Sequence, residues 1–151
     1  MGQLDAGDKQ AALVTLKRMP MCLQKLATLL EMAKRLHKKG MTAEARQLAE
    51  QCAALYQPKA PVEDLVTITA FAANIHRAIG DDDAARQTMK KLILNPRLKQ
   101  SLAARKRAAA ELADFQMFAE SYGLIQTIES PADRAQPLAK LAEKMVKTGH
   151  K

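Results

Sequence analysis

The sequence contains little of what a β-rich protein requires. Tryptophan is absent, only five residues are aromatic, and Val, Ile, Phe and Tyr together account for 15 of the 151 residues. Sheets are built largely from β-branched and aromatic side chains, so this scarcity argues against a β-sandwich or a barrel. Ala and Leu contribute 47 residues, and both enter helices at little entropic cost. The composition therefore predicts an all-α protein.

Cysteine and long apolar segments are also scarce. Cys22 and Cys52 are the only cysteines, too few for a disulfide framework, and a reduced compartment is the better expectation. The longest uncharged stretch, residues 65–76, has twelve residues and is too short to span a membrane. The first ten residues carry acids where a secretory signal needs bases. We therefore expect a cytoplasmic protein with no membrane partner.

No motif typical of catalysis is found. The chain lacks a glycine-rich phosphate loop, a paired-cysteine motif, a His-Glu-x-x-His motif and a nucleophile elbow. His37 and His76 are interpreted as helix-end or surface side chains rather than catalytic bases. The three acids Asp81–Asp83 are better explained as the start of a helix than as a metal site, since an EF-hand needs alternating ligands and a distal glutamate. We predict no enzymatic activity, no cofactor and no metal.

Glycines and prolines divide the chain into helical segments. Gly40 and Gly80 each follow apolar residues spaced three and four apart, where a left-handed C-cap favours glycine. Pro58, Pro61 and Pro96 mark further ends, because proline cannot continue a helix. We expect helices at residues 21–39, 42–56, 61–79, 81–94, 96–121 and 130–149, with 96–121 forming one helix or two.

The last third of the chain has three further signals. Tyr122 and Gly123 are expected to end the helical stretch 96–121, and residues 124–128 form a short apolar piece. Ser130 followed by Pro131 is typical of a capped helix start. Pro137 then lies inside the pattern and must kink this helix or mark its true beginning.

An internal repeat appears when the chain is compared with itself at an offset of 40 residues. Ala33, Gly40 and Ala45 meet Ala73, Gly80 and Ala85, so that an Ala, a Gly seven residues later and an Ala five residues after that recur in order. Half of this signature is found at Gly7 and Ala12, and the other half at Ala142 and Gly149. Small residues on both sides of a turn let two helices cross closely, which predicts stacked helix hairpins.

This signature resembles degenerate tetratricopeptide repeats, over residues 1–96 and in part over 131–149. Residues 61–89 also resemble the related pentatricopeptide repeats, whose members bind RNA. The characteristic aromatic residues of the family are missing, and the spacing of 40 exceeds the usual repeat of about 34 residues. The resemblance implies an all-α solenoid of stacked antiparallel hairpins, with seven to eight helices in one domain (1–151). A slice of a longer array is the alternative, with open end faces that would allow self-association. A self-assembling structural subunit that uses these end faces is therefore a further functional alternative.

The resemblance also implies a groove lined by the first helix of each hairpin. The groove residues expected on this basis are Lys34, His37, Lys38, Asn74 and Arg77. Asn74 matches an asparagine that in some members holds a peptide backbone or a terminal carboxylate, whereas Leu30 and Lys34 replace the rest of that clamp. The first hypothesis is therefore a non-enzymatic module whose mildly basic groove binds an acidic or mixed peptide of a protein partner.

The net charge of +8 comes from one window. Residues 86–109 carry eight bases and no acid, whereas the segments on either side are nearly balanced. Such a window would attract phosphates or an acidic partner, although it has no aromatic residue for base stacking. Nucleic-acid binding is the second hypothesis, a solvated surface remains the alternative, and the bases concerned are Arg86, Lys90, Lys91, Arg97, Lys99, Arg105, Lys106 and Arg107.

Overall fold

The computed structural model describes residues 23–57 and 59–149. Within these residues the chain forms helices and no strand, which confirms the all-α prediction. The elements are α2 (Leu23–Lys38), α3 (Thr42–Ala53), α4 (Val62–Ala78), α5 (Asp82–Leu94), the 3-10 helix η2 (Pro96–Gln100), α6 (Leu102–Asp114), α7 (Phe118–Gln126) and α8 (Pro131–Lys147).

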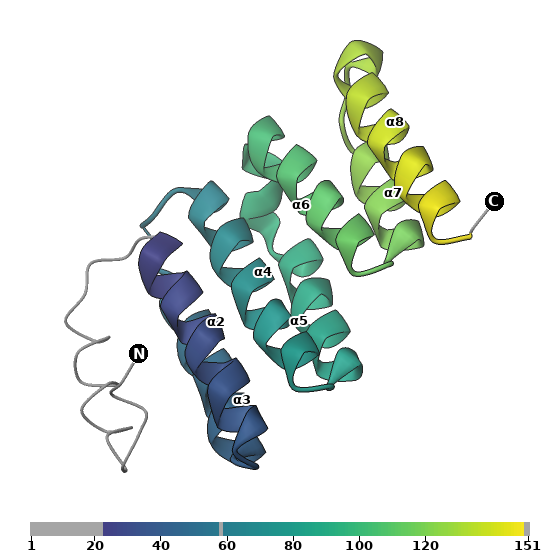
Figure 1. The fold of residues 1–151 in the computed structure, drawn as a ribbon. Helices are drawn as coiled ribbons and strands as arrows, with labels where there is room; N and C mark the ends of the chain where they lie inside the picture. Colours follow the sequence, from purple (N-terminus) through teal and green to yellow (C-terminus); the bar gives the residue numbers. More distant parts are fainter. Residues whose placement is uncertain (1–22, 58, 150–151) are drawn as a thin grey trace.

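The helices are arranged as consecutive antiparallel hairpins. α2 packs on α3, α4 on α5, and α6 on α7, and each pair is joined by a short turn. The first helices of these hairpins also contact one another, α2 with α4 and α4 with α6. Helix α6 contacts α8 in the same way, and α8 has no hairpin partner among the described residues. Figure 1 shows these four helices side by side in one layer, with α3, α5 and α7 in a second layer. Helices α2 and α8 lie at opposite ends of the row.

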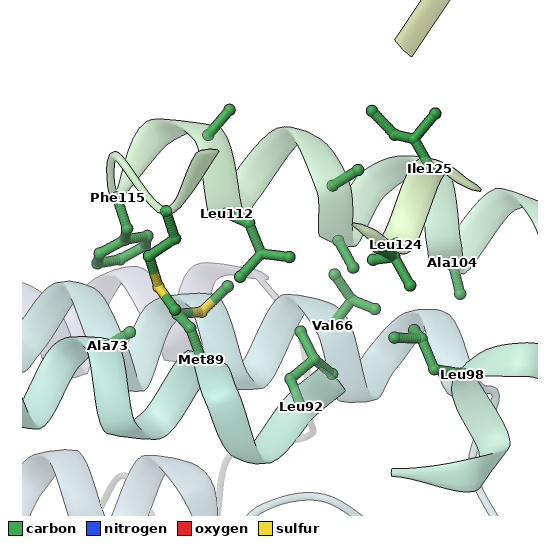
Figure 2. Packing of buried hydrophobic residues seen from close by; sticks show 14 of the residues in the cluster. Val66, Ala73, Met89, Leu92, Leu98, Ala104, Leu112, Phe115, Leu124 and Ile125 are labelled. Carbon is green, nitrogen blue, oxygen red and sulfur yellow. The ribbon is translucent and has the colours of Figure 1, made fainter. Parts of the chain in front are cut away.

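The core is formed by two clusters that meet on α4. One cluster joins α2, α3 and α4 and includes Leu26, Leu48 and Ile75, all fully buried. The other extends from α4 to α8, and Figure 2 shows Met89 and Leu112 packing within it. Each such side chain contributes about 1.5–3 kcal/mol when it leaves water. Burial on both faces of α4 therefore links the hairpins into one continuous core.

The turns at Gly40 and Gly80 have the same geometry, as the repeat predicts. Both glycines have positive φ, 79° and 82°. The N–H of Met41 donates to the carbonyl of Leu36, and the N–H of Asp81 donates in the same way to the carbonyl of His76. These are the bonds of a left-handed helix cap, which satisfy carbonyl groups at the helix end. The predicted hairpin turns are therefore confirmed.

The third hairpin differs from the expectation for residues 96–121. A 3-10 helix precedes α6, the chain turns after Asp114, and α7 then begins at Phe118. The expected helix end at Gly123 is wrong, because this glycine lies inside α7, which continues to Gln126. The turn is made by Gln116, which adopts φ 59° although it is not a glycine. Its neighbours repeat the left-handed cap, since Met117 N–H donates to the Leu112 carbonyl at 2.9 Å.

The turn at Gln116 reveals a third copy of the repeat. Ala109 lies seven residues before it and Ser121 five residues after it, the same spacing as Ala33, Gly40 and Ala45. Ala109 and Ser121 are both buried, and the Ser121 hydroxyl donates to the Ala109 carbonyl at 2.8 Å. The small residues on both sides of the turn are thus in contact, as the close-crossing interpretation requires.

Ser130 caps the start of α8, and its hydroxyl accepts a hydrogen bond from Asp133 N–H. This confirms the predicted capped start. Pro137 is an interior residue of α8, so the alternative that the helix begins there is wrong.

Candidate functional site

A groove of about 320 Å³ lies between α6, the first helix of the third hairpin, and α8. Its lining residues come mainly from these two helices, with one residue from α7. They are Lys106, Ala109, Ala110, Ala113, Asp114, Ser121, Gln136, Pro137, Lys140, Leu141, Glu143, Lys144 and Lys147.

The floor of the groove is apolar and closely packed. Ala109, Ala113 and Leu141 are buried side chains of the core. Ser121 is the polar member of the floor, and its hydroxyl is used by the hydrogen bond to the Ala109 carbonyl. The small side chains of α6 leave space between the helices, whereas larger ones would fill it. An apolar surface of this kind can accept the apolar side chains of a ligand.

The rim of the groove is basic. Four lysines line it against two carboxylates, those of Asp114 and Glu143. Lys144 is paired with Asp114, and this hydrogen bond raises the pKa of Lys144. Lys147 lies 3.1 Å from Glu143. The groove therefore combines an apolar floor with charged groups that keep a net positive charge.

The remaining two lysines of the rim differ in their partners. Lys106 lies 3.6 Å from Asp133. Lys140 is exposed and has no ion pair within the described part of the chain. Lys140 is consequently the cation that can meet a ligand carboxylate without breaking an existing pair.

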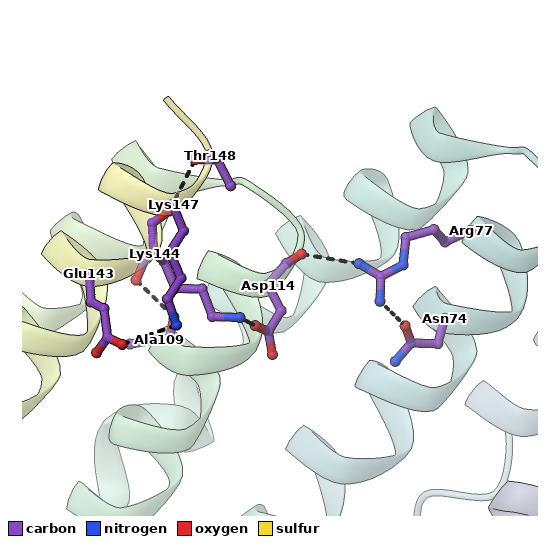
Figure 3. A network of polar contacts seen from close by, with 9 residues as sticks. Asn74, Arg77, Ala109, Asp114, Glu143, Lys144, Lys147 and Thr148 are labelled. Carbon is purple, nitrogen blue, oxygen red and sulfur yellow. Dashed lines mark hydrogen bonds and ion pairs between the residues drawn. The ribbon is translucent and has the colours of Figure 1, made fainter. Parts of the chain in front are cut away.

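A polar network connects this rim to α4 (Figure 3). Arg77 donates to the Asn74 amide oxygen and to the Asp114 main-chain carbonyl, the latter at 3.1 Å. The side chain of Asp114 in turn pairs with Lys144 of α8. Side-chain contacts thereby connect α4 to α6 and α6 to α8, the two walls of the groove.

Of the groove residues expected from the sequence, the structure brings together Asn74 and Arg77, which bond to each other. Lys34 is exposed and lies 3.5 Å from Glu31. Nδ1 of His37 is 3.0 Å from the hydroxyl of Thr42, across the first turn. Lys38 is exposed at the end of α2. None of these five lines the groove between α6 and α8.

The eight bases of residues 86–109 divide into three that make internal contacts and five that are exposed. Arg97 donates to the Tyr56 hydroxyl and to the Ala60 carbonyl and lies over the Tyr56 ring. Arg105 donates to the Thr127 carbonyl at 2.8 Å. With Lys106 paired to Asp133, three of the eight serve internal contacts. The other five are exposed and have no ion pair among the residues described: Arg86, Lys90, Lys91, Lys99 and Arg107.

The charge pattern of the sequence did not predict that Lys140, Lys144 and Lys147 border a groove. They lie in a segment whose total charge is nearly zero, so a window count of charge passes over them. Their spacing of four and three residues was the available signal, because it places them on one side of a helix. Counting charges in a window gives the net charge of a segment. Which residues share a face of a helix depends instead on their spacing in the sequence.

Outside the groove, the titratable side chains of Cys52 and Asp81 are accounted for by packing and helix capping, and His76 is half-buried. Cys52 is buried, its thiol donates to the Ile68 carbonyl, and burial raises its pKa to about 12. The reactive thiolate is therefore scarce near neutral pH. Burial also lowers the pKa of His76. Asp81 caps α5 by accepting from Ala84 N–H, as predicted for the acidic run.

Two absences apply to residues 23–57 and 59–149. In this range no three side chains of His, Cys, Asp or Glu are grouped to hold a metal ion. The described helices also include none with the length and hydropathy that crossing a membrane requires. Comparison of the chain with protein-family models, with curated proteins and with solved structures gives no match.

Proposed function

We propose that the protein is a non-enzymatic interaction module that binds an acidic or mixed-charge peptide segment of a protein partner in the groove between α6 and α8. The observation that carries this proposal is an apolar floor bordered by four lysines, located in the layer of first helices. This is the layer in which tetratricopeptide-like proteins bind their ligands, and the solenoid assignment itself stays a prediction.

The groove has two sources of binding free energy. Apolar side chains of a peptide would be buried against Ala109, Ala113 and Leu141, at about 25 cal/mol per Å² removed from water. Carboxylates of the peptide would meet Lys140 first and compete with Glu143 for Lys147. Exposed charges mainly set orientation and association rate, so the apolar contacts supply most of the affinity. The expected ligand is an amphipathic segment with one apolar and one acidic side.

The test uses a bulky side chain to fill the groove. Ala110 is an exposed residue of α6 that lines it, so Ala110→Trp blocks the groove without altering the core. Ala119→Trp is the matched control, because Ala119 is exposed on α7 and does not line the groove. A displayed library of random dodecapeptides is selected on the wild-type chain, and enriched peptides are then measured by fluorescence anisotropy on all three proteins.

We expect enriched peptides to be acidic and amphipathic, to bind the wild type and Ala119→Trp alike, and to lose at least tenfold in affinity on Ala110→Trp. Lys140→Glu should also weaken binding, and added salt should reduce the affinity for the wild type. Peptides that bind all three proteins equally, or a selection that enriches none, would contradict the proposal.

A second candidate function is nucleic-acid binding along α5. The specific observation is that Arg86, Lys90 and Lys91 are exposed on one helix and have no ion pair among the described residues. A gel shift with single-stranded RNA at two salt concentrations tests it, since phosphate contacts lose affinity steeply as salt rises. The triple change of these residues to Glu should abolish the shift, and absence of binding by the wild type at low salt ends this candidate.

A further inference from the structure

The repeat places a small residue of each first helix under the helix that follows. Ala33, Ala73 and Ala109 each lie seven residues before a left-handed turn residue, and their exposed fractions are 0%, 0% and 2%. They are covered because the second helix of each hairpin packs across them. The residue of that helix that lies five positions after the turn is also small. Burial of this alanine is thus a marker of a completed hairpin.

Helix α8 carries the first half of the same signature. Gly149 has φ 82°, and its N–H donates to the Val146 carbonyl, as the N–H of Gly40 and Gly80 do to the residues three before them. Ala142 stands seven residues before Gly149, yet it is exposed, and Val146 is 73% exposed. Ala135 and Ala139 are exposed on the same side of α8. The site where a second helix packs in the other hairpins has no cover among the residues that the structure describes.

One segment of the chain has the sequence of the helix that would fit. The positions five, nine and twelve residues after the turns at Gly40, Gly80 and Gln116 are buried. After Gln116 they are Ser121, Ile125 and Ile128. Gly7 is followed at the same distances by Ala12, Leu16 and Met19. Residues 7–19 lie outside the described residues, so the match concerns only residue type and spacing in the sequence.

This segment cannot reach α8 of its own chain. Residues 20–22 separate it from Leu23, so the link spans roughly 14 Å when fully extended. Helices α2 and α8 are at opposite ends of the row, with α4 and α6 between them (Figure 1). Three packing steps of 8–10 Å make this separation about 25–30 Å. Only a second copy of the chain can place its segment on the exposed face.

We propose that residues 8–19 of one copy pack on the exposed face of α8 of another copy and complete its hairpin. Each copy then offers one donor segment, which precedes α2 in the sequence, and one acceptor face on α8. Such a contact is heterologous, so the copies join head to tail into open chains or closed rings. The groove between α6 and α8 is a different surface of α8, and peptide binding there is independent of this assembly.

The experiment uses two complementary variants of the full chain. Ala142→Arg places a charge on the acceptor face, where it is exposed and leaves the fold of one copy intact. Ala12→Arg disables the donor segment. Ala119→Arg is the matched control on an exposed position of α7. Sedimentation velocity is measured over a range of concentrations for each protein and for an equal mixture of the two interface variants.

We expect the wild type and Ala119→Arg to exceed the monomer mass of 16.6 kDa increasingly with concentration. Each interface variant alone should stay monomeric. Their mixture should form a dimer and nothing larger, because it contains one intact donor and one intact acceptor. A monomeric wild type at its highest soluble concentration, or assembly unaffected by Ala142→Arg, would overturn the proposal.

A second measurement covers the case in which Ala12→Arg fails to fold. A labelled peptide of residues 7–20 is titrated with the wild-type chain and with Ala142→Arg at concentrations below those of self-assembly. Binding to the wild type with at least tenfold weaker binding to Ala142→Arg supports the proposal. Equal binding to both, or none to either, overturns it.

Discussion

The guanidinium carbon of Arg77 lies 4.2 Å from the centre of the Phe115 ring. Arg77 belongs to the last turn of α4, and Phe115 follows α6, so this contact joins the second hairpin to the third. The same guanidinium donates to the main-chain carbonyl of Asp114. The turn made by Gln116 is therefore attached to the preceding hairpin at two points.

The first prediction concerns this contact. Arg77→Met keeps an apolar stem and removes the charge, and we expect it to lower the free energy of unfolding by about 0.5–1.5 kcal/mol, from the lost ring contact and hydrogen bond. Urea denaturation measures the change. In a Phe115→Leu background the cost should shrink, because the ring is already absent. An equal cost in both backgrounds would show that Arg77 and Phe115 are not coupled.

The second prediction compares two glycines of opposite role. Gly80 has positive φ and open space where a Cβ would lie, so Gly80→Ala should destabilise by about 1 kcal/mol through backbone strain alone. Gly123 lies inside α7 and also has open space around it. Gly123→Ala should stabilise by about 0.5–1 kcal/mol, because alanine favours the helix. Thermal unfolding measures both, and changes of the same sign would refute the turn assignment.

The third prediction concerns the start of α6. The Ser101 hydroxyl accepts from Ala104 N–H at 3.1 Å and donates to the Glu63 carboxylate, which lowers the pKa of Glu63. Ser101→Ala should cost about 1–2 kcal/mol in unfolding free energy, since the helix cap and the bond to α4 are both lost. Ser130 caps α8 with a longer bond of 3.5 Å and serves as the comparison. If Ser130→Ala costs as much, the bond to Glu63 contributes nothing.

The fourth prediction concerns stability in acid. Burial lowers the pKa of His76 below its ordinary 6.5, against the attraction of Asp81 and Glu50 and together with repulsion from Arg46 and Lys91. Between pH 6.5 and the lowered pKa the unfolded chain binds a proton that the folded chain does not. His76 therefore reduces stability as the pH falls through this window.

The measurement is the difference between wild type and His76→Gln in urea denaturation at several pH values. The loss of stability on going from pH 7 to pH 5 should be smaller for the variant, because the carboxylates that also titrate are common to both proteins. Parallel curves for the two proteins would show that His76 has no part in acid destabilisation.

Local signals made the first two hairpins predictable. Gly40 and Gly80 stand at left-handed turns that only glycine adopts without strain, and each follows an apolar pattern of helical spacing. The caps at Asp81 and Ser130 are also local, because the side chain bonds to a backbone N–H three residues ahead. Where a particular residue type is required by a backbone conformation or caps a nearby N–H group, the sequence predicts the turn or the helix start.

The candidate site depends on contacts between helices that are distant in the sequence, and no short stretch of sequence reveals these contacts. Lys106 and Lys144 line the same groove although 38 positions separate them, because α6 and α8 pack against each other. The basic window 86–109 is continuous in sequence, yet the fold directs Arg97 and Arg105 to main-chain carbonyls. A count of charge along the chain could not separate these cations from exposed ones.

The sequence by itself determined that the protein is helical, and it determined the turns at Gly40 and Gly80, since both follow from backbone conformations that few residue types allow. Only the tertiary structure decided the turn at Gln116. A left-handed glutamine costs about 1–2 kcal/mol, and burial of Phe115 and Met117 on either side offsets this cost. The same packing of distant helices decided which lysines border the groove, because a surface between two helices exists only once both are in place.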